Sequence, residues 1–83
     1  MKLLYFAWLR ERIGTAREEV EVPTTIVTAG DLVDWLKTRE PRYAAAFEDV
    51  SAIKVAIDQK QADFSTPVQG AGEVAFFPPV TGG

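Results

Sequence analysis

The first quarter of the chain combines an apolar run with a strictly alternating segment. Residues 2–9 are mostly aromatic or branched, and the run is too short for a helix, so it predicts a strand buried largely on both faces. Gly14 lies in the turn that follows, where glycine can adopt a positive φ. From Glu19 to Val22 charged and apolar residues alternate, which is typical of a half-buried strand, and Pro23 ends it. The two segments predict an antiparallel hairpin.

A helical period runs through residues 28–40. Thr28 precedes Asp31 by three residues, which is the spacing of a capping box at a helix start. Apolar residues then recur at helical intervals and form one stripe, with Val33 beside it: Leu32, Trp35 and Leu36. Pro41 ends this helix and can begin a second short helical turn.

The remaining chain predicts two further strands with a loop between them. In residues 51–59 the apolar side chains Ile53, Val55 and Ile57 share one face, and "DQKQ" can then turn the chain back into a short strand near "QAD". Residues 63–72 contain the proline and glycines of a loop. Residues 73–77 form the final strand, with Val74 and Phe76 on one face and Ala75 and Phe77 on the other.

This order predicts an α+β fold: a mixed sheet of four to five strands with one main helix packed on one face. The last strand can pair in parallel beside the first, because parallel partners come from distant parts of a chain. That arrangement is the β-grasp, or ubiquitin-like, roll. We expect residues 1–77 to form this domain and residues 78–83 to form an extended tail.

Composition narrows the possible functions. With 83 residues the chain has the length of one small domain, and a net charge of −3 without a basic stripe argues against nucleic acid as a partner. The sequence contains neither cysteine nor histidine, so the commonest general base, a thiol nucleophile and the usual transition-metal ligands are all missing. We therefore expect no metal site and no independent enzyme. No apolar run approaches the length of a membrane span, and we expect a cytoplasmic protein.

The most unusual segment is the end, "FFPPVTGG". Pro78 and Pro79 favour polyproline II geometry and cannot donate to a sheet, so they should release the chain from the last strand and stiffen it. Side chains then shrink through Val80 and Thr81 to none at Gly82 and Gly83. Such a tail can deliver its carboxylate into a closed, dry site of another protein. A carboxylate needs activation, most simply as an acyl-adenylate made from ATP, and the protein would act as a group carrier.

Strand alternation also predicts a docking patch near this tail. If Leu3 and Tyr5 face the helix together with Ala7, then Phe6 and Trp8 face away with Leu4, and Phe77 joins them from the last strand. Exposed apolar patches usually mark binding sites. We expect Arg10, with Glu11 and Arg12, at the rim of this patch, and the acidic residues 18–21 on a solvated strand face.

Three segments carry a family resemblance. The end "EVAFFPPVTGG" resembles the C-terminus of the small, MoaD-like subunit of molybdopterin synthase, a ubiquitin-like sulfur carrier of molybdenum cofactor biosynthesis. The segment "LLYFAWLRERIGT" is similar to the first strand and turn of that family, and "VAIDQ" to its third strand, although Asp58 stands where Asn is common. The resemblance spans the whole chain, and its tail motif is the specific part.

The resemblance implies a chemistry for Gly83. An E1-like adenylyltransferase would use ATP to adenylate its carboxylate, and a sulfur donor protein would convert it to a thiocarboxylate. Pro78, Pro79, Val80, Thr81 and Gly82 would insert into the large subunit, where the sulfur passes to cyclic pyranopterin monophosphate to build the dithiolene. The family also implies a heterotetramer with two copies of each subunit, no permanently bound cofactor, and a partner interface that includes Phe6, Trp8, Arg10 and Phe77.

Three other functions remain open on the residues alone. The chain could carry sulfur for another pathway such as thiazole synthesis, although those carriers usually lack the "FFPPV" segment. It could be a protein modifier that forms isopeptide bonds with lysines. It could also be a β-grasp interaction module whose tail has no chemical role.

Overall fold

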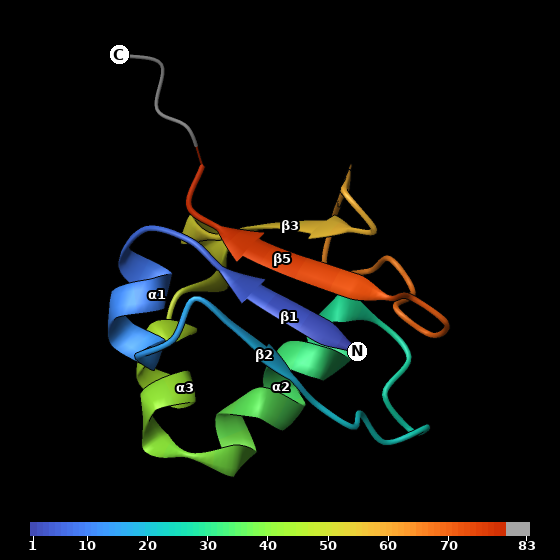
Figure 1. Cartoon of the computed structure of the whole chain (residues 1–83), viewed down its shortest axis with the longest axis horizontal. Coiled ribbons are helices and arrows are strands. Elements are labelled where there is room, and N and C mark those ends of the chain that lie inside the picture. Colours follow the sequence, from blue (N-terminus) through green and yellow to red (C-terminus); the bar gives the residue numbers. More distant parts are fainter. Residues whose placement is uncertain (80–83) are drawn as a thin grey trace.

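Strands β1 (Lys2–Tyr5) and β5 (Glu73–Phe77) lie side by side and parallel at the centre of a mixed sheet (Figure 1). The computed structural model describes residues 1–79. Within them the sheet has five strands in the order β2-β1-β5-β3-β4, and every pairing other than β1 with β5 is antiparallel. The other strands are β2 (Arg17–Glu19) and β4 (Lys60–Ala62) at the edges and β3 (Lys54–Ile57) between β5 and β4. This topology confirms the predicted β-grasp.

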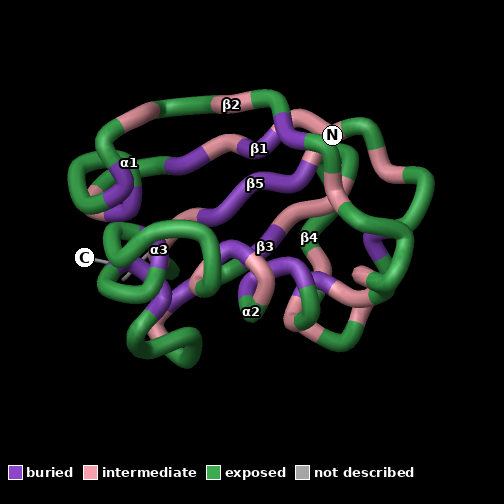
Figure 2. Tube along the Cα trace, turned by 90° about the horizontal axis from the view of Figure 1, so that it is seen from below, coloured by how far each residue is buried: buried purple, intermediate pink, exposed green. Residues whose placement is uncertain are grey.

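The helices lie on one side of this sheet, and the opposite side, which we call the outer face, carries none of the described helices (Figure 1). They are α1 (Trp8–Ile13), α2 (Ala29–Arg39), α3 (Pro41–Ala46) and the 3₁₀ turn η1 (Val50–Ala52). The core cluster lies between the helices and the sheet, seen from the helix side in Figure 2. Within residues 1–79, no helix has the length and apolar character that crossing a bilayer requires.

The first strand is shorter than the sequence predicts, and helix α1 replaces its second half. β1 ends at Tyr5, and Ala7 adopts a positive φ of 54°, which takes the chain out of the extended conformation. Leu9 and Ile13 then lie one helical turn apart and are both buried. Gly14 closes the helix in the left-handed region at φ 92°, donating its N–H to the Arg10 carbonyl at 2.8 Å. The prediction of a strand over residues 2–9 was therefore wrong beyond Tyr5.

The predicted hairpin is present, although its second strand lies earlier than expected. β1 and β2 pair antiparallel, and beyond the strand Met1 and Val20 exchange two hydrogen bonds of 3.0 Å. Burial alternates from Glu19 to Glu21 as predicted, because Val20 is buried while Glu19 and Glu21 are exposed. Only Glu19 of that segment lies within the described strand β2.

Helix α2 begins and ends as predicted. The Thr28 side chain accepts the Asp31 N–H at 3.1 Å, and the Asp31 carboxylate accepts the Thr28 N–H at 3.1 Å, which completes the capping box. The stripe contributes Leu32, Val33 and Leu36 to the core, while Trp35 is half-buried. Pro41 occupies the first turn of α3, so the short second helix is also confirmed.

The second half of the sheet also follows the prediction. Asp58 and Gln59 turn β3 into β4 with positive φ values of 49° and 70°. β3 is shorter than residues 51–59, because residues 50–52 form η1. In β5, Val74 and Phe76 are fully buried, as their shared parity predicts. Burial of Val74 and Phe76 in the core therefore fixes the orientation of β5, the strand from which the tail leaves.

Candidate functional site

The tail leaves the molecule from the middle of the sheet. In β5, Phe76 is opposite Tyr5 of β1 on one side and Val55 of β3 on the other. Phe6 continues this pairing by donating its N–H to the Phe76 carbonyl at 3.1 Å. After Phe77 no ladder continues through Pro78 and Pro79, which lie outside any described element. The chain thus reaches its tail directly from a strand that is paired on both sides.

Phe76 anchors the base of the tail. Its side chain has no exposed surface, stacks on Tyr5 with ring centroids 6.1 Å apart, and forms an edge-to-face pair with Phe47 whose ring centroids are 5.1 Å apart. Aromatic pairs in these geometries stabilise a core beyond the area they bury. The position where the tail begins is therefore rigidly defined by packing.

The predicted tail residues fall into two groups. Pro78 is half-buried and Pro79 is exposed, so the described part of the tail emerges into solvent within two residues. Val80, Thr81, Gly82 and Gly83 lie outside the described residues. Their predicted roles in insertion and in acyl chemistry stay predictions.

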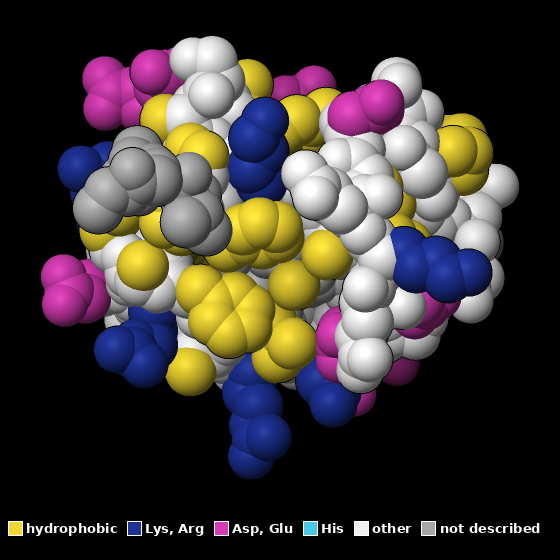
Figure 3. Space-filling model, turned by 90° about the horizontal axis from the view of Figure 1, so that it is seen from above, with side chains coloured by type: hydrophobic (Ala, Val, Ile, Leu, Met, Phe, Trp, Pro, Cys, Tyr) yellow, Lys and Arg dark blue, Asp and Glu magenta, His cyan; other side chains and the backbone are white. Residues whose placement is uncertain are grey.

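Two of the four predicted interface residues lie at the ends of neighbouring strands on the outer face. Phe6 is 48% exposed and directly follows β1, while Phe77 is half-buried at the end of the neighbouring strand β5. Leu4 and Ala75 extend this apolar area along the same two strands. Figure 3 shows apolar side chains gathered at the centre of this face. The placement fits a docking patch beside the tail exit.

Trp8 and Arg10 lie on α1, so strand alternation does not place them. Trp8 is half-buried, packs against the core, and lies under the Arg12 guanidinium at 4.6 Å from its ring centroid. Arg10 is exposed, as are Glu11 and Arg12. The expectation that Ala7 faces the helix was wrong, because Ala7 is exposed where the chain turns into α1.

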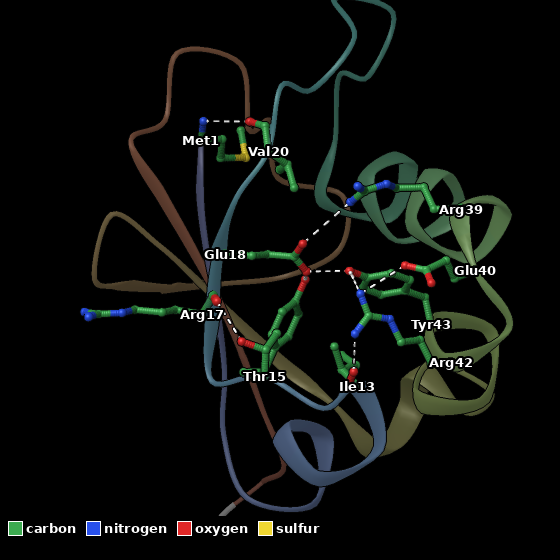
Figure 4. Close-up of polar contacts among 11 residues, drawn as sticks. Met1, Ile13, Thr15, Arg17, Glu18, Val20, Arg39, Glu40, Arg42 and Tyr43 are labelled. Carbon is green, nitrogen blue, oxygen red and sulfur yellow. Dashed lines mark hydrogen bonds and ion pairs between the residues drawn. The ribbon is translucent and has the colours of Figure 1, made fainter.

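A polar cluster on the helix side of the sheet was not predicted from the sequence. Glu18 Oε2 accepts hydrogen bonds from the hydroxyls of Tyr5 at 2.8 Å and Tyr43 at 2.6 Å, and Oε1 lies 3.8 Å from Arg39 Nη1 (Figure 4). Burial, followed by the hydrogen bond to Glu18, raises the pKa of both tyrosines. Residues 18–21 are therefore not one solvated acidic face.

The position of Glu18 in the alternating segment could have indicated this cluster. In an alternating segment Glu18 has the same parity as Val20, so the buried face of that strand includes a carboxylate. A half-buried carboxylate that faces the core requires donors, and tyrosine hydroxyls provide them without a second charge. The partner Tyr43 comes from α3, which no local pattern could have joined to β2.

Asp58 fixes the loop that leads into β5. Its Oδ1 accepts the N–H groups of Gly72 and Glu73, both at 3.0 Å, from the left-handed position in the β3–β4 turn. Asn and Asp tolerate that conformation better than other non-glycine residues. Asp58, which stands where Asn is common in the family, therefore keeps the acceptor oxygen that the turn uses.

Comparison with known proteins gives one consistent result. The chain is similar to the molybdopterin synthase sulfur carrier subunit of Escherichia coli (strain K12), at 39% identity over 100% of this chain and 99% of that protein. It is also similar to the protein of the same name from Mycobacterium tuberculosis, at 38% identity over 100% of this chain and 96% of that protein.

Solved structures agree with the fold. SAMP1 from Haloferax volcanii has a TM-score of 0.76 at 28% identity and covers 100% of this chain and 98% of that chain. A putative molybdopterin converting factor subunit 1 from Pyrococcus furiosus has a TM-score of 0.74 at 25% identity and covers 95% of each chain. The family model described as "ThiS family" matches residues 3–83. With this match over nearly its whole length, the chain belongs to the ThiS family.

Proposed function

We propose that this chain is the sulfur carrier subunit of a molybdopterin synthase. The observation that carries the proposal is the tail exit: β5 is fixed in the centre of the sheet, and the chain leaves it through Pro78 and Pro79. The relatives at 39% and 38% identity, which bear that name, support the assignment over the full length. A central anchor and a narrow end suit a reagent that is carried into another protein's site.

The chemistry takes place at Gly83. Its carboxylate attacks the α-phosphate of ATP in an E1-like adenylyltransferase, which forms an acyl-adenylate and releases pyrophosphate. A donor protein then supplies sulfur at the oxidation level of sulfide; the sulfur bonds to the acyl carbon, and AMP leaves. No cofactor needs to stay bound to this chain, because ATP is consumed on the activating enzyme.

Transfer takes place in the large synthase subunit, which supplies the catalytic groups. The thiocarboxylate sulfur bonds to a carbon of cyclic pyranopterin monophosphate while a carbon–oxygen bond of that substrate breaks and its oxygen leaves. Water then attacks the acyl carbon and breaks its bond to sulfur, so the sulfur stays on the pterin and the carrier leaves as a carboxylate. Two such transfers build the dithiolene. We propose that two carriers and two large subunits form a heterotetramer, with Phe6, Trp8, Arg10 and Phe77 at the contact.

Shortening the tail by one residue tests this function. Deleting Gly83 should abolish dithiolene formation in a reconstituted system of carrier, activating enzyme, ATP, sulfide, large subunit and cyclic pyranopterin monophosphate, because the carboxylate no longer reaches either site. The fold should be unaffected, since the core ends at Phe76. A matched variant, Thr81→Ser, keeps the length and should retain most activity. Full activity of the deletion variant would refute the proposal.

A further inference from the structure

Strand register arranges the outer face of the sheet in rows that cross the strands. Leu3, Tyr5, Val55, Val74 and Phe76 are buried in the core, so their neighbours in sequence point outward. The row farthest from the tail contains Glu19, Lys2 and Glu73. The next row contains Arg17, Leu4, Ala75, Ala56 and Gln61. Nearest the tail, Lys54 is opposite Phe77, and Phe6 follows β1 beside them.

Charges on this face are segregated. In the far row, Lys2 Nζ lies 3.9 Å from Glu73 Oε1, and the ammonium group of Met1 lies 3.5 Å from Glu19 Oε2. Asp63 follows β4 and continues its register beside Lys54, and it forms no ion pair within residues 1–79. The strand residues of the two rows nearer the tail include no acidic side chain. They include Arg17 and Lys54, which are exposed and form no ion pair within residues 1–79. The molecule as a whole has a net charge of −3, yet this part of its surface is basic.

The two cations flank the apolar strip. Arg17 is on the edge strand β2 and Lys54 is on β3, so β1 and β5 lie between them. Three strand spacings separate the two backbones, a span of about 14 Å. Figure 3, which looks onto this face, shows Lys and Arg side chains around the central apolar area. Whole-chain charge alone favours a basic partner, whereas this local pattern favours an acidic one.

We propose that this face docks a protein surface that has an apolar centre and carboxylates on both flanks, and that Arg17 and Lys54 set the orientation of that partner. The inference rests on the proposed function, and the partner is the large synthase subunit that receives the tail. The apolar strip supplies contact area, while complementary charges at its flanks guide association and exclude rotated arrangements. Because the tail leaves from the same face, orientation at this surface decides where the tail points.

A nucleic acid or an anionic membrane fits this surface less well. Either would need a row of cations that meets several phosphates, whereas here apolar side chains occupy the space between two isolated cations. An apolar centre with a charged rim is the ordinary anatomy of a protein interface.

Charge reversal tests the proposal. Arg17→Glu and Lys54→Glu, singly and together, are compared with Lys37→Glu, which makes the same charge change as each single variant on α2 in the opposite layer. Association with the purified large subunit is measured by stopped flow at low and high salt, after thermal unfolding has shown that each variant is folded. The double variant should associate about tenfold or more slowly and lose most of the salt dependence of the wild-type rate. Lys37→Glu should behave almost like the wild type.

Each other outcome has a distinct meaning. If the double variant associates like the wild type, or if Lys37→Glu slows association equally, the orienting role of Arg17 and Lys54 is overturned while the proposed function stands. If the wild-type chain does not bind the large subunit at all, the proposed function fails and this inference fails with it. Parallel titrations use a single-stranded oligonucleotide and phosphatidylserine vesicles. The proposal would be overturned if the wild-type chain binds the oligonucleotide or the vesicles and the double variant does not, while its association with the large subunit is unchanged. Arg17 and Lys54 would then be binding residues for that other ligand.

Discussion

The Tyr43 hydroxyl donates a 2.6 Å hydrogen bond to Glu18 Oε2 and so joins helix α3 to the edge strand β2. Tyr5 of the central strand donates to the same oxygen at 2.8 Å. Both tyrosines are buried, and Glu18 is the acceptor that satisfies both hydroxyls. β2 has only three residues, so this one carboxylate is a main link between the sheet edge and the helix layer.

Removing the acceptor should therefore be costly. Glu18→Ala should lower the free energy of unfolding by about 2–4 kcal/mol, because two buried hydroxyls lose their acceptor, although Tyr43 still accepts the Arg42 Nη2 hydrogen bond at 3.3 Å. Tyr43→Phe removes one of the two bonds and should cost about 1–2 kcal/mol. Urea denaturation of the purified chain measures both. Glu21→Ala, an exposed residue beyond β2, is the matched control. Equal stability of the Glu18 and Glu21 variants would mean that the cluster contributes nothing.

The capping box should make stability depend on pH. Hydrogen bonds from the backbone N–H groups of Thr28 and Val27 lower the pKa of the Asp31 carboxyl. A lowered pKa in the folded state stabilises the fold fully above the unfolded value of about 3.9, and this contribution is lost as pH falls through the folded pKa. Asp31→Asn should therefore flatten the decline of the unfolding midpoint below about pH 4. Asp34→Asn, on the same helix but outside the cap, is the control, and identical profiles for the two variants would contradict the assignment.

The two consecutive phenylalanines should differ in what they affect. Phe76→Ala should destabilise the fold by about 3–5 kcal/mol, because it empties a fully buried site between Tyr5 and Phe47. Phe77→Ala should leave the chain folded and instead weaken its binding to the large subunit, since this ring is half-buried on the outer face. Denaturation and calorimetric titration of both variants give the comparison. Loss of binding without loss of stability in Phe76→Ala would reverse the roles.

Asp58 offers a test of the loop that leads into β5. Asp58→Asn should be nearly neutral, because an amide oxygen can accept the same two N–H groups and Asn tolerates the left-handed conformation. Asp58→Ala removes the acceptor and should cost about 1–2 kcal/mol. Thermal unfolding of the two variants measures the difference. Equal losses in both would show that the negative charge, and not the acceptor geometry, is what the turn requires.

The sequence predicted those features of the fold that depend on residues close together in the chain. The cap at Thr28, the stop at Pro41 and the parity of Val74 and Phe76 depend on neighbours in sequence, and the structure confirms all of them. The turn at Asp58 was also predicted. The parallel pairing of β1 with β5 followed from the order of elements rather than from any single residue.

The failures arose where a local pattern had two interpretations. The apolar run into Leu9 suits a strand, yet Leu9 and Ile13 also lie one helical turn apart with Gly14 behind them, and a positive φ at Ala7 decides for the helix. Glu18 was assigned to solvent because its partner Tyr43 comes from a distant helix. For the candidate site, Phe6 and Phe77 were placed correctly on the outer face by parity, whereas Trp8 and Arg10 depended on the misassigned strand.

The intact mass of the protein shows directly whether Gly83 carries sulfur. The chain is incubated with its E1-like activating enzyme, ATP and sulfide, and its mass is compared with that of a sample without ATP and with that of the Gly83 deletion. We expect an ATP-dependent mass increase equal to the replacement of one oxygen by sulfur, located in the C-terminal peptide and absent from the deletion. An unchanged mass, under conditions in which the same enzyme converts an Escherichia coli carrier subunit, would contradict the proposed role of Gly83.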